Sequence, residues 1–167
     1  MVDGRLIVTG HKGFVGKSLV KMARSQGIDV LTVEGDLLDK DVATSLSETI
    51  SGSDVLVHLA GTFFGGDSEI IKKNTLVSLV IAKIASEKPN LKVILTSTGA
   101  VYGNSGSEAI SESTVLTPNT VYGMAKKWGE EAFGFYMSDP LRQLTVFRLP
   151  SVYGPGNETG VIARFIK

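Results

Sequence analysis

The chain has 167 residues, of which 43% are hydrophobic and 20% charged, and 17 basic side chains balance 17 acidic ones. The absence of cysteine excludes disulfides, thiolate metal sites and a cysteine nucleophile, and the balanced charge argues against nucleic-acid binding. The longest apolar stretch, residues 77–82, is too short for a membrane span, and residues 1–5 do not resemble a signal peptide. We therefore expect a single cytoplasmic globular domain over residues 1–167, with neither nucleic-acid nor membrane partners.

Segments rich in Val, Ile and Leu alternate with segments whose apolar residues recur at helical spacing. The strand-like segments are residues 5–9, 29–33, 55–60, 92–97 and 144–149. The helix-like segments are residues 15–23, 42–50, 70–85 and 121–137. Strand segments with few charges are typical of strands buried on both faces. This order requires right-handed crossovers, so it predicts an α/β fold with a doubly wound, mostly parallel sheet and helices on both faces.

A glycine-rich loop joins the first strand-like segment to the first helix-like segment. Gly10, Gly13 and Gly16 are spaced three residues apart. Such glycines permit a tight turn, let backbone N–H groups approach a pyrophosphate and let a helix pack closely on a strand, and the helix N-terminus adds partial positive charge. The loop therefore predicts a dinucleotide site. The alternative is a strand-to-helix turn that binds no ligand.

Tyr122 and Lys126 stand four residues apart, on one face of the last predicted helix. A neutral tyrosine is a poor base, but a neighbouring ammonium and an oxidised nicotinamide ring would both favour its phenolate form. Lys126 could also hold ribose hydroxyls. Thr98, at the end of a predicted strand, could hydrogen-bond a substrate oxygen beside Tyr122. The alternatives are a surface tyrosine, a solvated lysine and a threonine that caps a turn.

Five motifs occur in the order and approximate spacing of a known family. They are residues 9–16, residues 58–61, residues 97–103, the Tyr122/Lys126 pair and residues 147–156. With these motifs the chain resembles the NAD-dependent epimerase/dehydratase family, the extended branch of the short-chain dehydrogenases/reductases, over almost its whole length. The resemblance implies a Rossmann-type fold, a nicotinamide dinucleotide across the carboxyl edge of the sheet and a nucleotide-sugar substrate, and it allows a homodimer.

The resemblance also implies roles for individual residues. The positions that hold the pyrophosphate are matched by Gly10, Gly13, Phe14, Val15 and Gly16. The other cofactor-contacting positions are matched by Asp36, Leu37, Leu59, Ala60, Gly61, Asn74, Tyr122 and Lys126. The catalytic positions are matched by Thr98, Tyr122 and Lys126. In this mechanism Tyr122 removes a sugar hydroxyl proton while hydride passes to the cofactor, and the keto sugar is then epimerised, dehydrated or reduced.

Three features depart from the family pattern. The region before residue 55 is shorter by one strand–helix unit. Glu34, near the end of the second strand, would accept a hydrogen bond from a ribose 2′-hydroxyl and would repel a 2′-phosphate, which favours NAD over NADP. Ser151 stands where many members have an Asn that contacts substrate phosphates. The sequence ends within an apparent helix with an apolar stripe, where members build their substrate lobe, so we expect that lobe to be absent. The stripe is Val161, Ile162, Phe165 and Ile166.

The sequence leaves three interpretations of function open. The first is an NAD-dependent nucleotide-sugar epimerase, dehydratase or reductase, or the cofactor-binding half of one. The second is a dinucleotide-binding regulatory or interaction module without chemistry. The third is a Rossmann-like domain for another nucleotide. Thr98, Tyr122 and Lys126 favour the first, and the expected absence of the substrate lobe favours the second.

Overall fold

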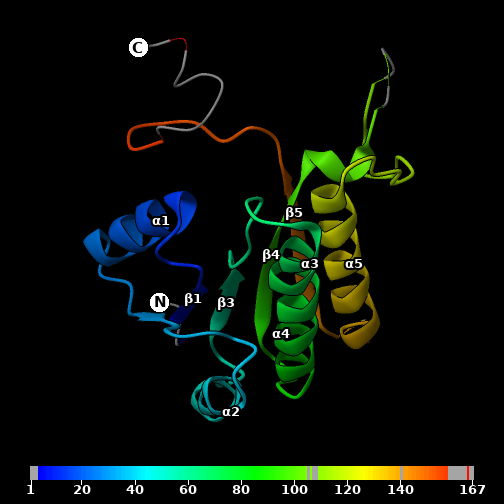
Figure 1. Cartoon of the computed structure of the whole chain (residues 1–167). Coiled ribbons are helices and arrows are strands. Elements are labelled where there is room, and N and C mark those ends of the chain that lie inside the picture. The colour runs from blue at the N-terminus through cyan, green and yellow to red at the C-terminus, as the bar shows by residue number, and fades with distance from the viewer. Residues whose placement is uncertain (1–3, 105, 107–108, 140, 158–164, 166–167) are drawn as a thin grey trace.

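Five parallel strands form one sheet, in the order β2-β1-β3-β4-β5 (Figure 1). The structure, a computed structural model, describes residues 4–104, 106, 109–139, 141–157 and 165. The strands are β1 (Leu6–Thr9), β2 (Val30–Thr32), β3 (Val55–His58), β4 (Lys92–Thr98) and β5 (Gln143–Leu149). The doubly wound parallel sheet predicted from the sequence is confirmed. Among the described residues no strand lies beyond β2, in agreement with the strand–helix unit missing from the sequence.

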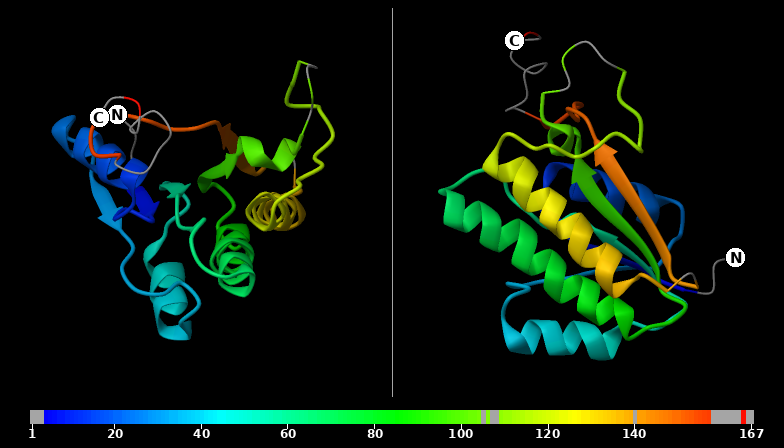
Figure 2. Two further views of the ribbon diagram at one scale, coloured as in Figure 1. Left: turned by 45° about the horizontal axis from the view of Figure 1, so that its top comes forward. Right: turned by 90° about the vertical axis from the view of Figure 1, so that its right-hand side faces the viewer.

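Helices cover both faces of the sheet. They are α1 (Phe14–Ser25), α2 (Lys40–Thr49), α3 (Asp67–Ile71), a π-helix (Lys72–Leu76), α4 (Val77–Ser86), a 3-10 helix (Gly99–Tyr102) and α5 (Val121–Tyr136). The chain moves one way from β1 to β2 and the other way in every later crossover, so α1 lies on one face and α2, α4 and α5 lie on the other (Figures 1 and 2). No helix in the described part of the chain is long and apolar enough to cross a membrane.

The main hydrophobic core lies between the sheet and the helices α2, α4 and α5. Ile7 of β1, Leu56 of β3 and Val93 of β4 point to this side, where Ile81 and Phe133 pack against them. Each of these side chains is at most 1% exposed. The parallel register aligns Ile7 with Leu56 and Leu56 with Val93, so the apolar side chains form one continuous layer.

The third predicted helix is interrupted by the π-helix, which the sequence pattern does not indicate. Asn74 lies within it and is 1% exposed. Its Nδ2 donates to the Ile70 carbonyl at 2.8 Å, the acceptor that its own backbone N–H would use in an α-helix, and to the Thr62 carbonyl at 2.6 Å. A side chain that takes this acceptor accounts for the locally widened turn. The predicted helix at the end of the chain lies outside the described residues, apart from Phe165.

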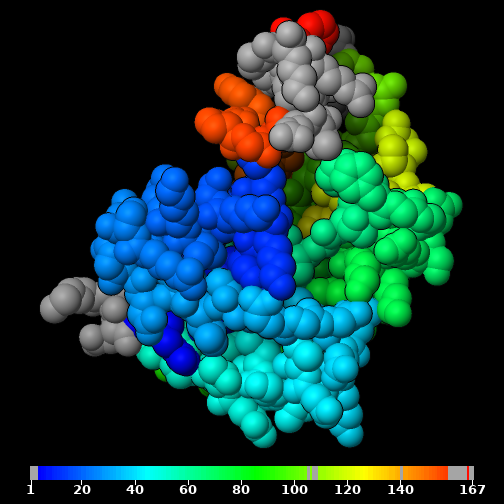
Figure 3. All heavy atoms as spheres, turned by 60° about the vertical axis from the view of Figure 1, so that its left-hand side comes forward, coloured from blue at the N-terminus to red at the C-terminus, as the bar shows by residue number. Residues whose placement is uncertain are grey.

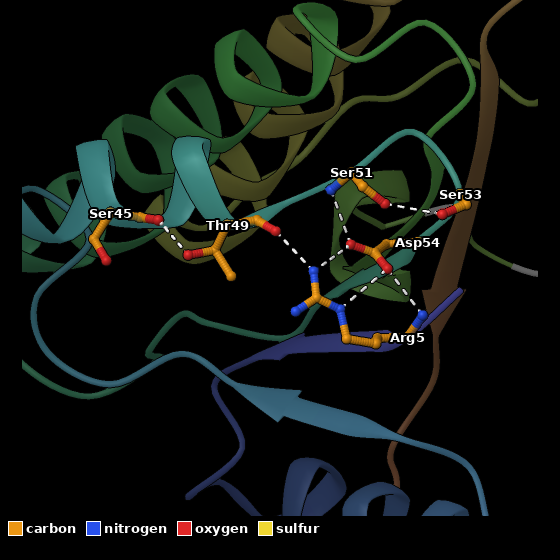
Figure 4. A network of polar contacts seen from close by, with 6 residues as sticks. All are labelled: Arg5, Ser45, Thr49, Ser51, Ser53 and Asp54. Carbon is orange, nitrogen blue, oxygen red and sulfur yellow. Dashed lines mark hydrogen bonds and ion pairs between the residues drawn. The ribbon is translucent and has the colours of Figure 1, made fainter. Parts of the chain in front are cut away.

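An ion pair joins β1 to the start of β3 at the amino edge of the sheet (Figure 4). Arg5 Nη2 lies 3.0 Å from Asp54 Oδ2 and 2.7 Å from the Thr49 carbonyl, and the Arg5 backbone N–H donates to Asp54 Oδ1 at 2.8 Å. Burial alone would raise the pKa of the Asp54 carboxyl, but hydrogen bonds from Arg5 and from the Ser51 backbone hold it below 3.8. These contacts fix the edge opposite the candidate site.

Candidate active site

The candidate site lies where the direction of the crossovers reverses, between the carboxyl ends of β1 and β3. In open α/β sheets this point leaves a crevice that binds ligands. Here Gly10 follows β1, and Ala60 and Gly61 follow β3; together with residues 33–37 after β2 they line a cavity of about 300 Å³. Figure 3 shows the hollow between the blue glycine loop and the teal segment after β3. We refer to it as the switch-point cavity.

The three glycines of the loop differ in what requires them. Gly10 has φ +70°, and a Cβ there would lie 2.6 Å from the Ala60 nitrogen. A Cβ on Gly16 would lie 2.4 Å from the Gly10 carbonyl oxygen. These two glycines are therefore needed for the fold itself. A Cβ on Gly13, the N-cap of α1, would meet only the Gly10 carbonyl, at 3.2 Å, so packing demands a glycine less strictly there.

A buried hydrogen-bond network joins β1 to β3 beneath the cavity. Thr9 Oγ1 accepts from the backbone N–H groups of Leu59 (3.2 Å) and Ala60 (3.3 Å), so its own proton is directed to His58 Nδ1 at 2.7 Å. His58 then carries its proton on Nε2, which lies 3.4 Å from Ser78 Oγ. Burial, with a smaller effect of Lys126, lowers the pKa of His58 to about 3, so the ring is neutral.

The cavity contains only some of the cofactor-binding residues that were predicted from the sequence. Those that line it are Gly10, Glu34, Asp36, Leu37, Ala60 and Gly61. Its further lining residues are His11, Lys12, Val33, Gly35, Thr62, Glu69, Lys73 and Val77, which sequence reasoning missed. The basic side chains His11 and Lys12 stand within the glycine motif and could have been noticed there. Lys73 carried no signal, because it belongs to a predicted helix recognised only by its apolar face, and Glu69 lies just before that helix.

The two candidate carboxylates of the cavity are already ion-paired. Glu34 lies 2.8 Å from His11 Nε2 and 2.7 Å from Lys12 Nζ, and Asp36 lies 2.7 Å from Lys73 Nζ. A hydrogen bond from Lys12 lowers the pKa of Glu34, and one from Lys73 lowers the pKa of Asp36. Lys12 offsets the repulsion between Glu34 and a 2′-phosphate, so the preference for NAD over NADP is weaker than Glu34 alone would indicate.

Thr98 and Tyr122 come together from β4 and α5. A Cβ on Gly123 would lie 2.6 Å from the Ala100 carbonyl oxygen, so the glycine lets α5 approach the 3-10 helix and brings Tyr122 beside Thr98. Burial raises the pKa of the Tyr122 phenol above 10.0, and a hydrogen bond from Thr98 opposes this effect. Thr98 Oγ1 also accepts from the Ala100 backbone at 3.2 Å, so the capping role considered from the sequence is present as well.

Lys126 lies one turn further along α5 and is only 7% exposed. Burial lowers the pKa of its ammonium to about 8, against a smaller opposing effect of Glu130. The described residues provide its Nζ with no hydrogen-bond partner. Lys126 therefore keeps its proton at neutral pH at a cost in stability, which is typical of a functional rather than a structural lysine.

The remaining predicted residues have different surroundings. Asn74 Oδ1 is buried without a hydrogen-bond partner in the described part of the chain, and it lies so close to Gly61 that a Cβ there would be 2.5 Å away. Phe14 and Val15 form the first turn of α1, and neither they nor Gly13 and Gly16 are among the residues that line the cavity. The Leu59 backbone N–H donates to Thr9. Ser151 lies in an exposed segment after β5, outside the cavity.

Almost the whole chain matches the model of one protein family. The model of the NAD dependent epimerase/dehydratase family matches residues 6–167. The chain belongs to this family. The fold expected from the resemblance is the observed one, and the glycine loop, Tyr122 and Lys126 lie within the matched range.

Two similar proteins are sugar-nucleotide enzymes by name. A dTDP-glucose 4,6-dehydratase from Streptomyces niveus is 26% identical over an alignment of 187 positions. The alignment covers 90% of this chain and 54% of that protein. A GDP-6-deoxy-D-talose 4-dehydrogenase from Aggregatibacter actinomycetemcomitans is 28% identical over an alignment of 182 positions. The alignment covers 98% of this chain and 60% of that protein. This family member thus spans little more than half the length of these relatives.

Solved structures agree with the fold. The structure described as MoeE5 in complex with UDP-glucose and NAD has a TM-score of 0.80 and 26% identity, and the match covers 98% of this chain and 60% of that one. The Bordetella bronchiseptica enzyme WbmG, solved with NAD and UDP, has a TM-score of 0.84 at 24% identity over 96% of this chain and 57% of its own. The second likeness supports the fold alone.

Replacing Lys126 with Met should stabilise the protein at neutral pH, by on the order of 1–3 kcal/mol, because it removes a buried charge. The ammonium has a pKa of about 8 in the folded protein against the ordinary 10.5. Between these values the unfolded chain binds more protons, so wild-type stability rises with pH and the advantage of Lys126→Met shrinks. Urea unfolding below pH 8 and above 10.5 measures both effects.

Lys127→Met is the matched control, because Lys127 is 31% exposed on the same helix and should give little change at either pH. If Lys126→Met proved less stable than wild type at neutral pH, the buried ammonium would be stabilising and the assignment of its low pKa would be wrong.

Proposed function

We propose that this chain is the dinucleotide-binding part of an NAD-dependent enzyme that oxidises a hydroxyl of a nucleotide sugar, as in epimerases and dehydratases. The observation that carries the proposal is the meeting of Thr98 and Tyr122 at the carboxyl edge, with Lys126 buried on the same helix. The names of the relatives and of MoeE5 support a nucleotide-sugar substrate. The lack of cysteine supports a reducing, cytoplasmic location.

The residues around the switch-point cavity fit NAD. The pyrophosphate would lie over Gly13, with the amides of Phe14 and Val15 as donors, because Gly13 leaves open the space that a side chain would fill. Glu34 would accept from the adenosine ribose, and Asp36 with Leu37 would contact adenine. The unpartnered Oδ1 of Asn74, behind Gly61, supports a polar contact on the side of the cofactor nearer to Tyr122.

The chain's own residues perform the proton chemistry. NAD, when bound, accepts a hydride from the sugar and can return it. Tyr122 removes the proton of the reacting hydroxyl, and Thr98 hydrogen-bonds the same oxygen. Lys126, still protonated at neutral pH, holds ribose hydroxyls and favours the phenolate of Tyr122. The resulting keto sugar would then be epimerised, dehydrated or reduced.

A dinucleotide-binding module without chemistry is the second candidate. The raised pKa of Tyr122 favours it, because such a phenol is a weak base until a nearby positive charge lowers the pKa. Both candidates require NAD binding, so only a measurement of turnover separates them.

Gly13→Val should abolish most NAD binding, because a branched side chain would occupy the place of the pyrophosphate. We expect a loss of affinity of at least about tenfold, equal to roughly 1.4 kcal/mol, in calorimetric titration. Gly134→Val is the control, since a Cβ at this position of α5 has no neighbour within 4 Å. NADP, titrated in parallel, should bind more weakly than NAD. Equal NAD affinity of Gly13→Val and wild type would contradict the placement of the pyrophosphate.

Tyr122→Phe should lower turnover by about 10² to 10⁴ in the complete enzyme to which we assign this chain, because it removes the general base. NAD affinity should change little, since the ring and its packing remain. Product analysis with UDP-, GDP- and dTDP-sugars measures the effect, and Tyr136→Phe on the same helix is the control. Unchanged turnover in Tyr122→Phe would leave the binding module as the better interpretation.

A homodimer through α4 and α5 is the partner that we propose for this chain. These helices lie side by side on the outer face of the molecule (Figure 2), and their exposed sides carry large apolar residues. The residues are Leu76 at the end of the π-helix, Leu79 on α4, and Met124, Trp128 and Phe135 on α5. Lys83 on α4 and Glu131 on α5 flank this surface with opposite charges, so two antiparallel copies would complement each other.

Trp128→Glu should convert the dimer into a monomer in sedimentation velocity, because it places a charge in the apolar surface. Met22→Glu is the control: Met22 is 62% exposed on α1, on the other face of the sheet, and should leave the dimer intact. A monomeric wild-type protein at high concentration would exclude the dimer.

A further inference from the structure

Two adjacent phenylalanines are exposed beside the candidate base. Phe63 and Phe64 follow β3 and are 58% and 61% exposed. Their ring centroids lie 4.0 Å apart, and the ring of Phe63 meets that of Tyr122 edge-on, with centroids 6.3 Å apart and an angle of 68°. Exposing two neighbouring aromatic rings to water costs free energy, and exposed apolar patches mark sites of interaction.

The segment that carries Phe63 is held from within the molecule. Asn74 Nδ2, which is buried, donates to the Thr62 carbonyl at 2.6 Å. The Thr62 hydroxyl accepts from the Phe64 backbone N–H and donates to the Phe64 carbonyl, both at 3.1 Å. The backbone on either side of Phe63 is therefore tied to the π-helix, and its ring is directed at Tyr122 by a fixed anchor.

We propose that Phe63 is a positioning residue for Tyr122: anchored by Asn74 through Thr62, its ring covers the phenol ring and fixes its orientation next to Thr98. The importance of this contact for catalysis rests on the proposed function, in which Tyr122 is the base. Phe64 stacks against Phe63, and the ring pair with Tyr122 is made by Phe63. An edge-on aromatic pair is directional, so it fixes the phenol ring better than a flexible aliphatic side chain would.

Phe63 is one of the groups that surround the Tyr122 ring. Burial of that ring is the main cause of its raised pKa. Thr98 acts in the other direction. Phe63 and Thr98 thus set the phenol between an apolar cover and a hydrogen-bond donor before any ligand binds.

The contact can be tested on the chain alone by nitrating tyrosines with tetranitromethane and following each one by peptide mass spectrometry. Phe63→Ala should speed nitration of Tyr122 by about fivefold, the size expected when one aromatic contact is lost. Phe64→Ala is the matched control and should have a smaller effect. Tyr153, which is 66% exposed, gives the reference rate, and Tyr102, which is 9% exposed, reports any general opening of the fold.

A second variant keeps the test valid if Phe63→Ala does not fold. Phe63→Leu retains apolar volume but has no ring, so it should move the NMR resonances of the Tyr122 ring while its nitration rate stays near that of wild type. Unchanged nitration in Phe63→Ala, or unchanged resonances in Phe63→Leu, would overturn the proposal. Neither measurement uses a cofactor, so failure of NAD binding would contradict the proposed function and leave this inference standing.

Discussion

The hydrogen bond between Thr9 and His58 is the contact on which the candidate site depends. It joins the ends of β1 and β3, the two neighbouring strands from which the chain leaves in different directions. The neutral state of His58 is essential, because a protonated ring could not accept from Thr9 while Thr9 itself receives two backbone N–H groups. Because the strand ends are fixed in this way, Gly10 can lie against the backbone of Ala60, and the two residues form one wall of the cavity.

Local patterns in the sequence were sufficient to predict the order of the strands and helices and the position of the glycine loop. Apolar runs predict the five strands because parallel strands are buried on both faces, and the observed bounds differ by only a few residues. The π-helix could not be predicted, because the apolar pattern does not show that Asn74 takes the Ile70 carbonyl and also binds the carbonyl of Thr62, twelve residues earlier. The sequence also could not distinguish the roles of Gly10, Gly13 and Gly16, because these roles depend on neighbours in space.

The candidate residues could be named from the sequence, but their electrostatic state could not be predicted. Tyr122 and Lys126 were recognisable from their spacing, and the closeness of Thr98 to Tyr122 depends on Gly123, which lets α5 approach the 3-10 helix that follows β4. The pairing of Glu34 with Lys12 and of Asp36 with Lys73 joins residues 22 and 37 positions apart, and no periodicity indicates such pairs. The carboxylates expected to receive ribose and adenine are therefore engaged before any ligand arrives.

Charged groups are exposed and ion-paired around the switch-point cavity, whereas near Tyr122 the charge of Lys126 is buried. Around the cavity the ion pairs are exposed, so they cost little to form and can be exchanged for contacts to a ligand. At the other end Lys126 is buried with a lowered pKa, whereas Tyr122 has a raised one, so both groups hold their protons at neutral pH. A positive charge bound beside Tyr122 would lower the pKa of the phenol. In the proposed function, a cation bound beside Tyr122 would therefore make the phenol a stronger base than it is in the free protein.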